Sequence, residues 1–173
     1  AVAPPSSLQT VAPALSDPKS TVPWTRVTWT RDVGAGTDVI SFGNQLLLMG
    51  YDSRDGRGEQ VLLDQPASYA KPLISPSGQE IVYSVRTQNT VLAMEWDRWE
   101  PRHIADGFAL AVWVDPDTSD EWVYVGEDQA RTDPPSYQSI YRYRLTNPQQ
   151  RELVWDAQPV SGDSFQLSAD GRY

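Results

Sequence analysis

The sequence predicts an all-β fold, and two observations carry that prediction. From about residue 24 onward, runs rich in Val, Ile, Leu, Tyr and Trp alternate with clusters of Gly, Asp, Asn and Pro, as in short strands joined by turns. No stretch of this region repeats its apolar residues with the 3.6-residue period of an α-helix. The 173 residues, 39% of them hydrophobic, are enough for one ordinary domain core.

The first 23 residues differ from the rest. They are rich in Pro, Ser, Ala and Thr with little periodicity, which favours an extended tether; an arm packed along the domain is the alternative. The opening Ala1-Val-Ala-Pro-Pro has neither an initiator Met nor a basic leader, as in a chain processed after export or a shortened one. We therefore expect a periplasmic or secreted protein with a tether at 1–23 and a folded region at 24–173.

Charge and composition exclude several classes of function. The 14 Lys and Arg against 23 Asp and Glu give a net charge of -9, which repels nucleic acids and anionic membrane surfaces. No apolar run approaches the roughly 20 residues of a transmembrane helix, so none is predicted. The absence of Cys excludes thiolate catalysis, Cys-ligated zinc and disulfides.

One arrangement, a strand, a polar corner and a second strand, recurs four times. With the corners placed at Gly43, Gly78, Asp120 and Gly171, subtraction gives intervals of 35, 42 and 51 residues. Such periods are typical of β-propeller blades, each made of four short antiparallel strands. The third corner is longer, spanning 115–120, and the fourth copy stops as its second strand begins. The paired strands are expected at 38–43 with 44–51, 72–77 with 79–85, 109–114 with 121–126, and 163–170 with 172–173.

The outer half of a blade is also visible. Residues 139–145 alternate polar and apolar side chains, and with a turn at 146–150 and a strand at 151–155 they form a predicted hairpin. Residues 90–96 and 102–105 make the corresponding pair one blade earlier.

These motifs resemble a known family. Ser75-Pro-Ser-Gly-Gln-Glu-Ile-Val-Tyr-Ser84 is similar to the Ser-Pro-Asp-Gly-Lys-x-Ile-x-Phe-Ser core of TolB-like propeller repeats, and Leu167-Ser-Ala-Asp-Gly-Arg-Tyr173 is a second example. Residues 140–153 resemble the outer hairpin of that family, and the whole likeness covers about residues 37–173. The departures are Ser77, where Asp is usual, and the lengthened corner at 115–120. The resemblance implies an exported propeller without naming its ligand, since such repeats occur in translocation proteins, peptidases and lyases.

About three and a half blades cannot close a ring. A sheet that ended at Tyr173 would leave an unpaired edge and an open apolar flank, which folded proteins avoid. We therefore expect the natural protein to continue, with the remaining blades packing against this part.

Two acidic loops have a composition that suits Ca²⁺, which prefers oxygen ligands. Neither has the dense Asp-x-Asp-x-Asp-Gly alternation of strong calcium loops, and both also fit plain solvated turns. We therefore expect no tight calcium binding and no cofactor. The residues that such a site would use are Asp52, Asp55 and Glu59 in the first loop and Asp115, Asp117 and Asp120 in the second.

The sequence offers little catalytic machinery. His103 is the only histidine, so neither a His-based triad nor a two-His metal site can form within this chain. No nucleophile elbow, phosphate loop or dinucleotide motif occurs. We therefore expect a binding or scaffold module for a protein, peptide or glycan. The alternative is the propeller part of a polysaccharide lyase or hydrolase whose catalytic groups lie beyond residue 173.

Seven Trp and eight Tyr are the most suggestive surplus, because aromatic faces bind sugars, peptides and cations. Trp96 and Trp99 flank a short turn, and together with Arg102 they form the predicted exposed ligand-binding patch. The aromatics expected to pack between blades instead are Tyr83, Trp113, Trp122 and Tyr124.

Overall fold

Antiparallel strands make up nearly all regular structure in the computed structural model, which describes residues 24–34, 45–127, 136–162 and 165–171. Within these ranges there is no α-helix, only a 3-10 turn at Arg86–Gln88. No helix in the described ranges is therefore long and apolar enough to span a bilayer. The predicted all-β fold is confirmed.

The strands form three larger sheets and one small one. The first sheet has the order β1 (Arg26–Asp32), β2 (Leu46–Asp52), β3 (Glu59–Ala67). The second has the order β4 (Tyr69–Ile74), β5 (Glu80–Val85), β6 (Thr90–Glu95), β7 (Arg102–Asp106). The third has the order β8 (Phe108–Val114), β9 (Glu121–Glu127), β11 (Ser139–Arg144), β12 (Asn147–Trp155). Two short strands, β10 (Ser136–Tyr137) and β13 (Val160–Ser161), pair with each other.

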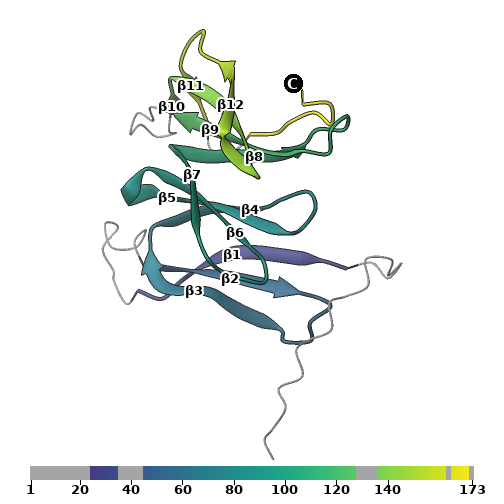
Figure 1. The fold of residues 1–173 in the computed structure, drawn as a ribbon. Helices are drawn as coiled ribbons and strands as arrows, with labels where there is room; N and C mark the ends of the chain where they lie inside the picture. The colour runs from purple at the N-terminus through teal and green to yellow at the C-terminus, as the bar shows by residue number, and fades with distance from the viewer. Residues whose placement is uncertain (1–23, 35–44, 128–135, 163–164, 172–173) are drawn as a thin grey trace, which may run out of the picture.

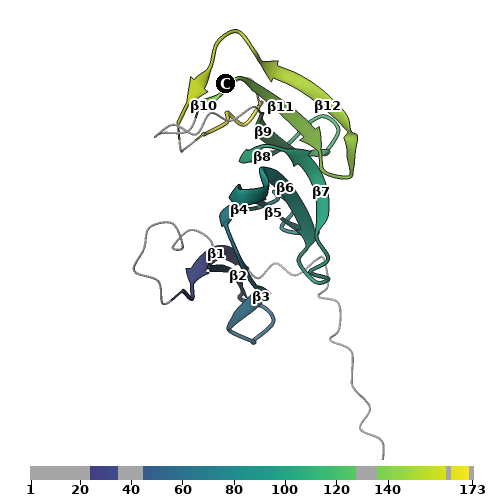
Figure 2. The same cartoon turned by 90° about the vertical axis from the view of Figure 1, so that its left-hand side faces the viewer.

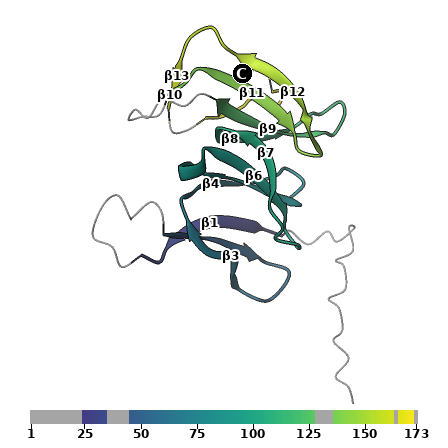
Figure 3. The same cartoon turned by 60° about the vertical axis from the view of Figure 1, so that its left-hand side comes forward.

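The three larger sheets stack on one another in chain order (Figure 1). The chain passes from edge strand β3 directly to β4 and from edge strand β7 through Gly107 to β8. As a result β1, β4 and β8 lie along one side of the stack, where β1 contacts β4 and β4 contacts β8 (Figures 2 and 3). The arrangement is propeller-like, because each sheet is entered at one edge and left at the other.

Strand β5 shows why the sheets stack. Ile81 and Tyr83 belong to an apolar cluster with the first sheet, whereas Val82 belongs to a cluster with the third sheet. Successive side chains of a strand point to opposite faces, so a strand that is apolar at every position must be covered on both faces. The buried Ser84 fits because its Oγ accepts a hydrogen bond from the Ala109 backbone N–H at 2.8 Å.

Strand β9 repeats the pattern one sheet later. Val123 and Val125 face the second sheet, while Trp122 and Tyr124 face the opposite side together with Trp113 of β8. All five are at most 8% exposed. The prediction that Tyr83, Trp113, Trp122 and Tyr124 are packing residues is confirmed.

Two of the predicted corners share one geometry. Gly78 and Gly171 have φ values of +75° and +68°, and their N–H groups donate to the carbonyls of Ser75 and Ser168 at 2.7 and 2.9 Å. A Cβ at Gly78 would lie 2.9 Å from the Trp24 ring, and one at Gly171 would lie 2.7 Å from the Trp113 ring. Both the left-handed backbone and the close aromatic neighbour therefore require glycine.

The third corner has no glycine at its left-handed residue. At 115–120 the Asp115 Oδ1 accepts the Asp117 N–H at 2.9 Å, and Ser119 supplies the left-handed residue with φ of +62°. The Ser77 N–H donates to the Glu121 carboxylate at 2.6 Å, which places this corner beside that of the second sheet. The corners after β4 and β8 thus lie at one end of the stack.

The first predicted copy is wrong in its pairing. Strand β2 pairs with β1 in register from Arg26↔Asp52 to Asp32↔Leu46, whereas the expected partner 38–43 and the corner Gly43 lie outside the described residues. Arg26 and Asp52 lie beside Gly78, so the connection between Asp32 and Leu46 begins and ends at the opposite end of the sheet. Strand β2 therefore runs parallel to β4, and is not the counterpart of β5.

Two further boundaries differ from prediction. The hairpin of β11 and β12 turns at 145–146, so residues 147–150, expected as turn, belong to β12. Pro148 fits there because β12 is an edge strand, where a missing N–H costs no ladder hydrogen bond. In the fourth copy the described residues 165–171 form a turn at 168–171 and no strand.

Burial between the sheets leads to a stability prediction. Leu48→Ala, at a residue 0% exposed between the first and second sheets, should lower the free energy of unfolding by about 2–5 kcal/mol. Leu153→Ala, the same change on strand β12 at 50% exposure, should shift it by about 0.5 kcal/mol or less. Urea unfolding of both variants tests this, and equal losses would contradict the assignment of the interface.

Buried tyrosines lead to a pH prediction. Burial raises the pKa of Tyr83, and burial together with the Glu127 carboxylate raises the pKa of Tyr143 to about 12 from 10.0. The folded chain then keeps phenol protons that the unfolded chain releases, so the free energy of unfolding should fall as pH rises from about 10 to about 12. Below pH 10 both tyrosines are protonated in the folded and the unfolded chain, so the free energy of unfolding should not change with pH through them. Circular dichroism and tyrosinate absorbance should change together, and Tyr143→Phe should make the fall shallower.

Candidate functional site

The fold separates the two tryptophans of the predicted patch. Trp96 is 4% exposed and packs in the cluster between the first and second sheets, so the prediction that its ring is exposed is wrong. The Trp96 N–H donates to the Gln79 carbonyl at 2.8 Å, which continues the alternation of β6 by one residue and directs the ring inward. Trp99 is 37% exposed, and its Nε1 donates to the Trp96 carbonyl at 2.6 Å.

Arg102, the third member of the patch, has a partner within the fold. Its Nη2 donates to both Glu80 carboxylate oxygens at 2.7 and 2.6 Å and to the Leu145 carbonyl at 3.1 Å. The side chain therefore ties β7 to β5 and to the third sheet. Of the predicted patch, only Trp99 combines an exposed aromatic face with freedom from the core, and its role in binding stays a prediction.

Of the three candidate calcium ligands around the loop after β2, Asp52 ends β2, Asp55 lies in the loop and Glu59 begins β3, and each has a partner. Asp52 forms an ion pair with Arg26, and Glu59 forms one with Arg31. Asp55 accepts the Arg57 N–H at 2.9 Å through Oδ1. This loop is a hydrogen-bonded turn between β2 and β3.

The loop at 115–120 is also tied to its own surroundings. Asp115 accepts the Asp117 N–H, and Asp120 pairs with Arg144 of β11. Across the part of the chain that the structure describes, no three His, Cys, Asp or Glu residues gather as metal ligands would. The absence of tight calcium binding stays a prediction. His103 is exposed on β7, and its Nε2 lies 3.1 Å from the Oδ1 of Asp106.

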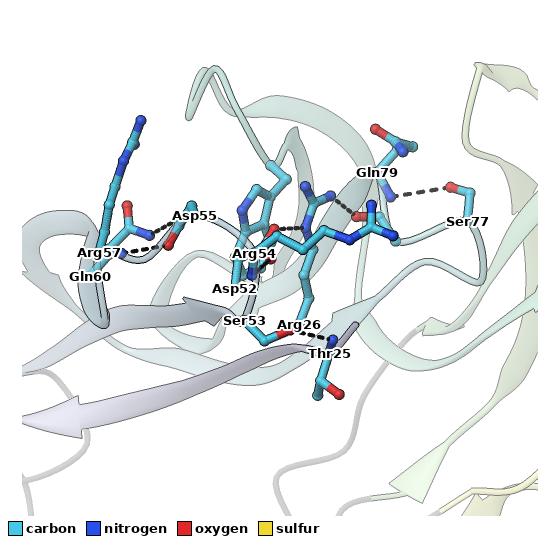
Figure 4. Close-up of polar contacts among 12 residues, drawn as sticks. Thr25, Arg26, Asp52, Ser53, Arg54, Asp55, Arg57, Gln60, Ser77 and Gln79 are labelled. Atoms are coloured by element: carbon cyan, nitrogen blue, oxygen red, sulfur yellow. Dashed lines mark hydrogen bonds and ion pairs between the residues drawn. The ribbon is translucent and has the colours of Figure 1, made fainter. Parts of the chain in front are cut away.

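A different cluster, which the sequence analysis did not identify, joins the first two sheets. Arg26, at the start of β1, forms an ion pair with Asp52 at 2.7 Å, and their side chains are only 12% and 5% exposed (Figure 4). Its Nη1 also donates to the Gly78 carbonyl at the corner of the second sheet. The guanidinium carbon lies 4.7 Å from the Trp24 ring centre and 4.8 Å from that of Trp96. A buried cation is thus held by a carboxylate, a carbonyl and two aromatic rings.

The same cluster borders a hollow at the surface. Trp24, Arg26 and residues 74–78 line a space of about 310 Å³ whose walls are largely polar. Arg54, from the loop after β2, lies with its guanidinium carbon 4.3 Å from the Trp24 ring centre. Figure 4 shows its side chain extending alongside Arg26 toward the corner that carries Ser77 and Gln79. We call this polar hollow the corner pocket.

A weak signal in the sequence marks the corner pocket. Trp24 and Arg26 are two residues apart where a strand begins, and this spacing places both side chains on one face. Neither the partner Asp52 nor the carbonyl of Gly78 follows from that spacing, because they come from 26 and 52 residues away.

Comparison with known proteins identifies no family. No family model matches the chain, and no curated protein matches it. Ten chains of solved structures match. One belongs to work on the structure and mechanism of two prolyl endopeptidases, and on inter-domain dynamics in their catalysis and specificity. That match has 17% identity and a TM-score of 0.44, and it covers 75% of this chain and 22% of the other.

The buried ion pair leads to a prediction with an internal control. Arg26→Met should lower the free energy of unfolding by about 3–5 kcal/mol, because it leaves the Asp52 carboxylate buried without its partner. Arg31→Met, on the same strand, breaks an ion pair with Glu59 whose side chains are 42% and 45% exposed, and should cost about 1 kcal/mol or less. Urea unfolding measures both. Similar small losses would show that the Arg26 pair does not hold the sheets together.

Proposed function

We propose that this chain is part of an exported β-propeller of TolB-like repeats, acting as a binding or scaffold module for a protein, peptide or glycan. The observation that carries the proposal is the propeller-like stack, in which the corners after β4 and β8 meet at one end. Propellers commonly use the loops at one end of their blades for recognition, because the strands hold those loops rigidly while leaving their sequences free. Export is proposed from the resemblance of residues 37–173 to TolB-like repeats, which implies an exported propeller.

The sheet topology supports the assignment of blades. The second and third sheets each have four strands, as a propeller blade does. The first has three, and its edge strand β1 runs opposite to β4, so it matches a blade that lacks its innermost strand. Residues 165–171, whose corner matches that of Gly78, would begin the next blade. We propose that these three sheets and the start of the next blade account for the part of about three and a half blades expected from the sequence.

The outer faces of the stack support the presence of further blades. On the first sheet, Val27, Tyr51 and Val61 are 44%, 38% and 40% exposed. On the third sheet, Tyr124, Ile140 and Val154 line an apolar hollow of about 110 Å³, which residues 165–167 and 171 line in part. Apolar sheet faces of this kind are normally covered, and the remaining blades of the same protein are the proposed cover.

Recognition is proposed to use the loop end that carries Trp99. Its turn, 96–101, lies between β6 and β7, and the loop 53–58 and the corner 75–79 flank the same end. An aromatic ring anchored by its Nε1 yet exposed on one face suits stacking on a sugar or a peptide side chain.

Ligand screening tests this proposal. The full chain should bind members of an arrayed peptide or glycan library, and Trp99→Ala should weaken the binding of those ligands by about tenfold, the loss of roughly 1.4 kcal/mol of stacking. The melting temperature should stay within a few degrees. Trp155→Ala is the matched control, because Trp155 is a 39% exposed ring on the outer strand β12. Unchanged binding in Trp99→Ala, equal loss in both variants, or hydrolysis of a bound ligand would contradict the proposal.

A further inference from the structure

The arginines of the loop after β2 stand apart from the others. The described residues include ten arginines, and seven of them form ion pairs with Asp or Glu. The three that form none within the described residues are Arg54, Arg57 and Arg86, and the first two belong to one loop. In a chain with a net charge of -9, cations without an acidic partner are the exception.

Arg54 is the one of these three that lies beside the corner pocket. Its guanidinium carbon lies 4.3 Å from the centre of the Trp24 ring, which lines the pocket, whereas Arg57 is exposed three residues further along the loop. Arg86 lies elsewhere, with its guanidinium carbon 5.6 Å from the Phe108 ring centre. The Trp24 ring therefore holds two guanidinium groups, those of Arg26 and Arg54, at one site.

Hydrogen-bond donors remain free at that site. Arg26 uses Nε for Asp52 and Nη1 for Gly78, so its Nη2 has no partner in the described part of the chain. The guanidinium of Arg54 likewise makes no hydrogen bond there, since only its backbone N–H is engaged, by Asp52. Planar guanidinium forks with free N–H groups match the oxygens of a carboxylate or phosphate.

The neighbouring acids leave this capacity intact. Asp52 is neutralised by Arg26, and Glu121 on the far side of the corner is held by the N–H and hydroxyl of Ser77 at 2.6 and 3.1 Å. The backbone N–H and hydroxyl of Ser77 at this corner thus already bind one carboxylate, that of Glu121. Among the described residues, no Asp or Glu forms an ion pair with Arg54.

We propose that the corner pocket binds the oxyanion of a ligand, a carboxylate or a phosphate, between Arg54 and the Nη2 group of Arg26 above the Trp24 ring. The inference rests on the proposed binding function and assigns the charged group of its ligand. The volume of about 310 Å³ accommodates such a group with the atoms that attach it to a peptide or sugar.

Titration calorimetry with two small probes tests the site. The full chain is titrated with succinate and, separately, with inorganic phosphate, at low and matched ionic strength because salt screens exposed charges. We expect saturable binding of at least one probe, weakened about tenfold in Arg54→Gln. Binding of succinate assigns carboxylate ligands, and binding of phosphate assigns phosphorylated ones.

Arg57→Gln is the matched control, since it removes an exposed charge of the same loop that makes no contact with the Trp24 ring among the described residues. It should change the affinity by about twofold or less. Failure of both probes to bind the wild-type chain, or equal weakening in the two variants, would overturn the proposal. Anion binding with an empty peptide and glycan screen would count against the proposed recognition function alone, so the two proposals fail separately.

Discussion

The structure depends on one constraint, the need to cover both faces of its central strands. Strands β5 and β9 each carry an unbroken apolar run, at 81–83 and 122–125, and alternation sends successive side chains of each run to opposite faces. A single sheet that is exposed on one side could not bury them. Stacking satisfies both faces together, and it explains why the apolar clusters lie between sheets and draw residues from both.

Polar ties complement this packing at one end of the stack. Arg26 of the first sheet reaches the corner of the second, Ser77 of that corner holds Glu121 of the third, and Trp113 of the third donates to the Ala169 carbonyl at 2.9 Å. Each tie involves the corner at 75–78 or the turn at 168–171. Apolar contact is non-directional, whereas these hydrogen bonds set how each sheet is positioned on the next.

The same end of the stack combines rigidity with available chemistry. Trp24 and Trp96 contact the guanidinium of Arg26, and Arg54 lies exposed against the Trp24 ring. Trp99, three residues after Trp96, exposes its ring to solvent. A side chain such as Arg54 loses less freedom on binding when a structural ring already holds it. The cluster that stabilises the first two sheets therefore also restrains Arg54 at the neighbouring surface.

The sequence by itself determined the all-β class, the strands of the second and third sheets and the glycine corners at Gly78 and Gly171. Those features follow from period-2 alternation and from turn chemistry, which act over a few neighbouring residues. Tertiary structure decided the pairing of β1 with β2, the burial of Trp96 and the joining of Arg26 to Asp52 and Gly78. In each case the partner lies on another strand or another sheet, so the pattern of neighbouring residues in the sequence does not predict it. Trp96 illustrates the difference. Its neighbours in the sequence predict a turn residue, and only the packing of the first sheet against it makes it part of the core.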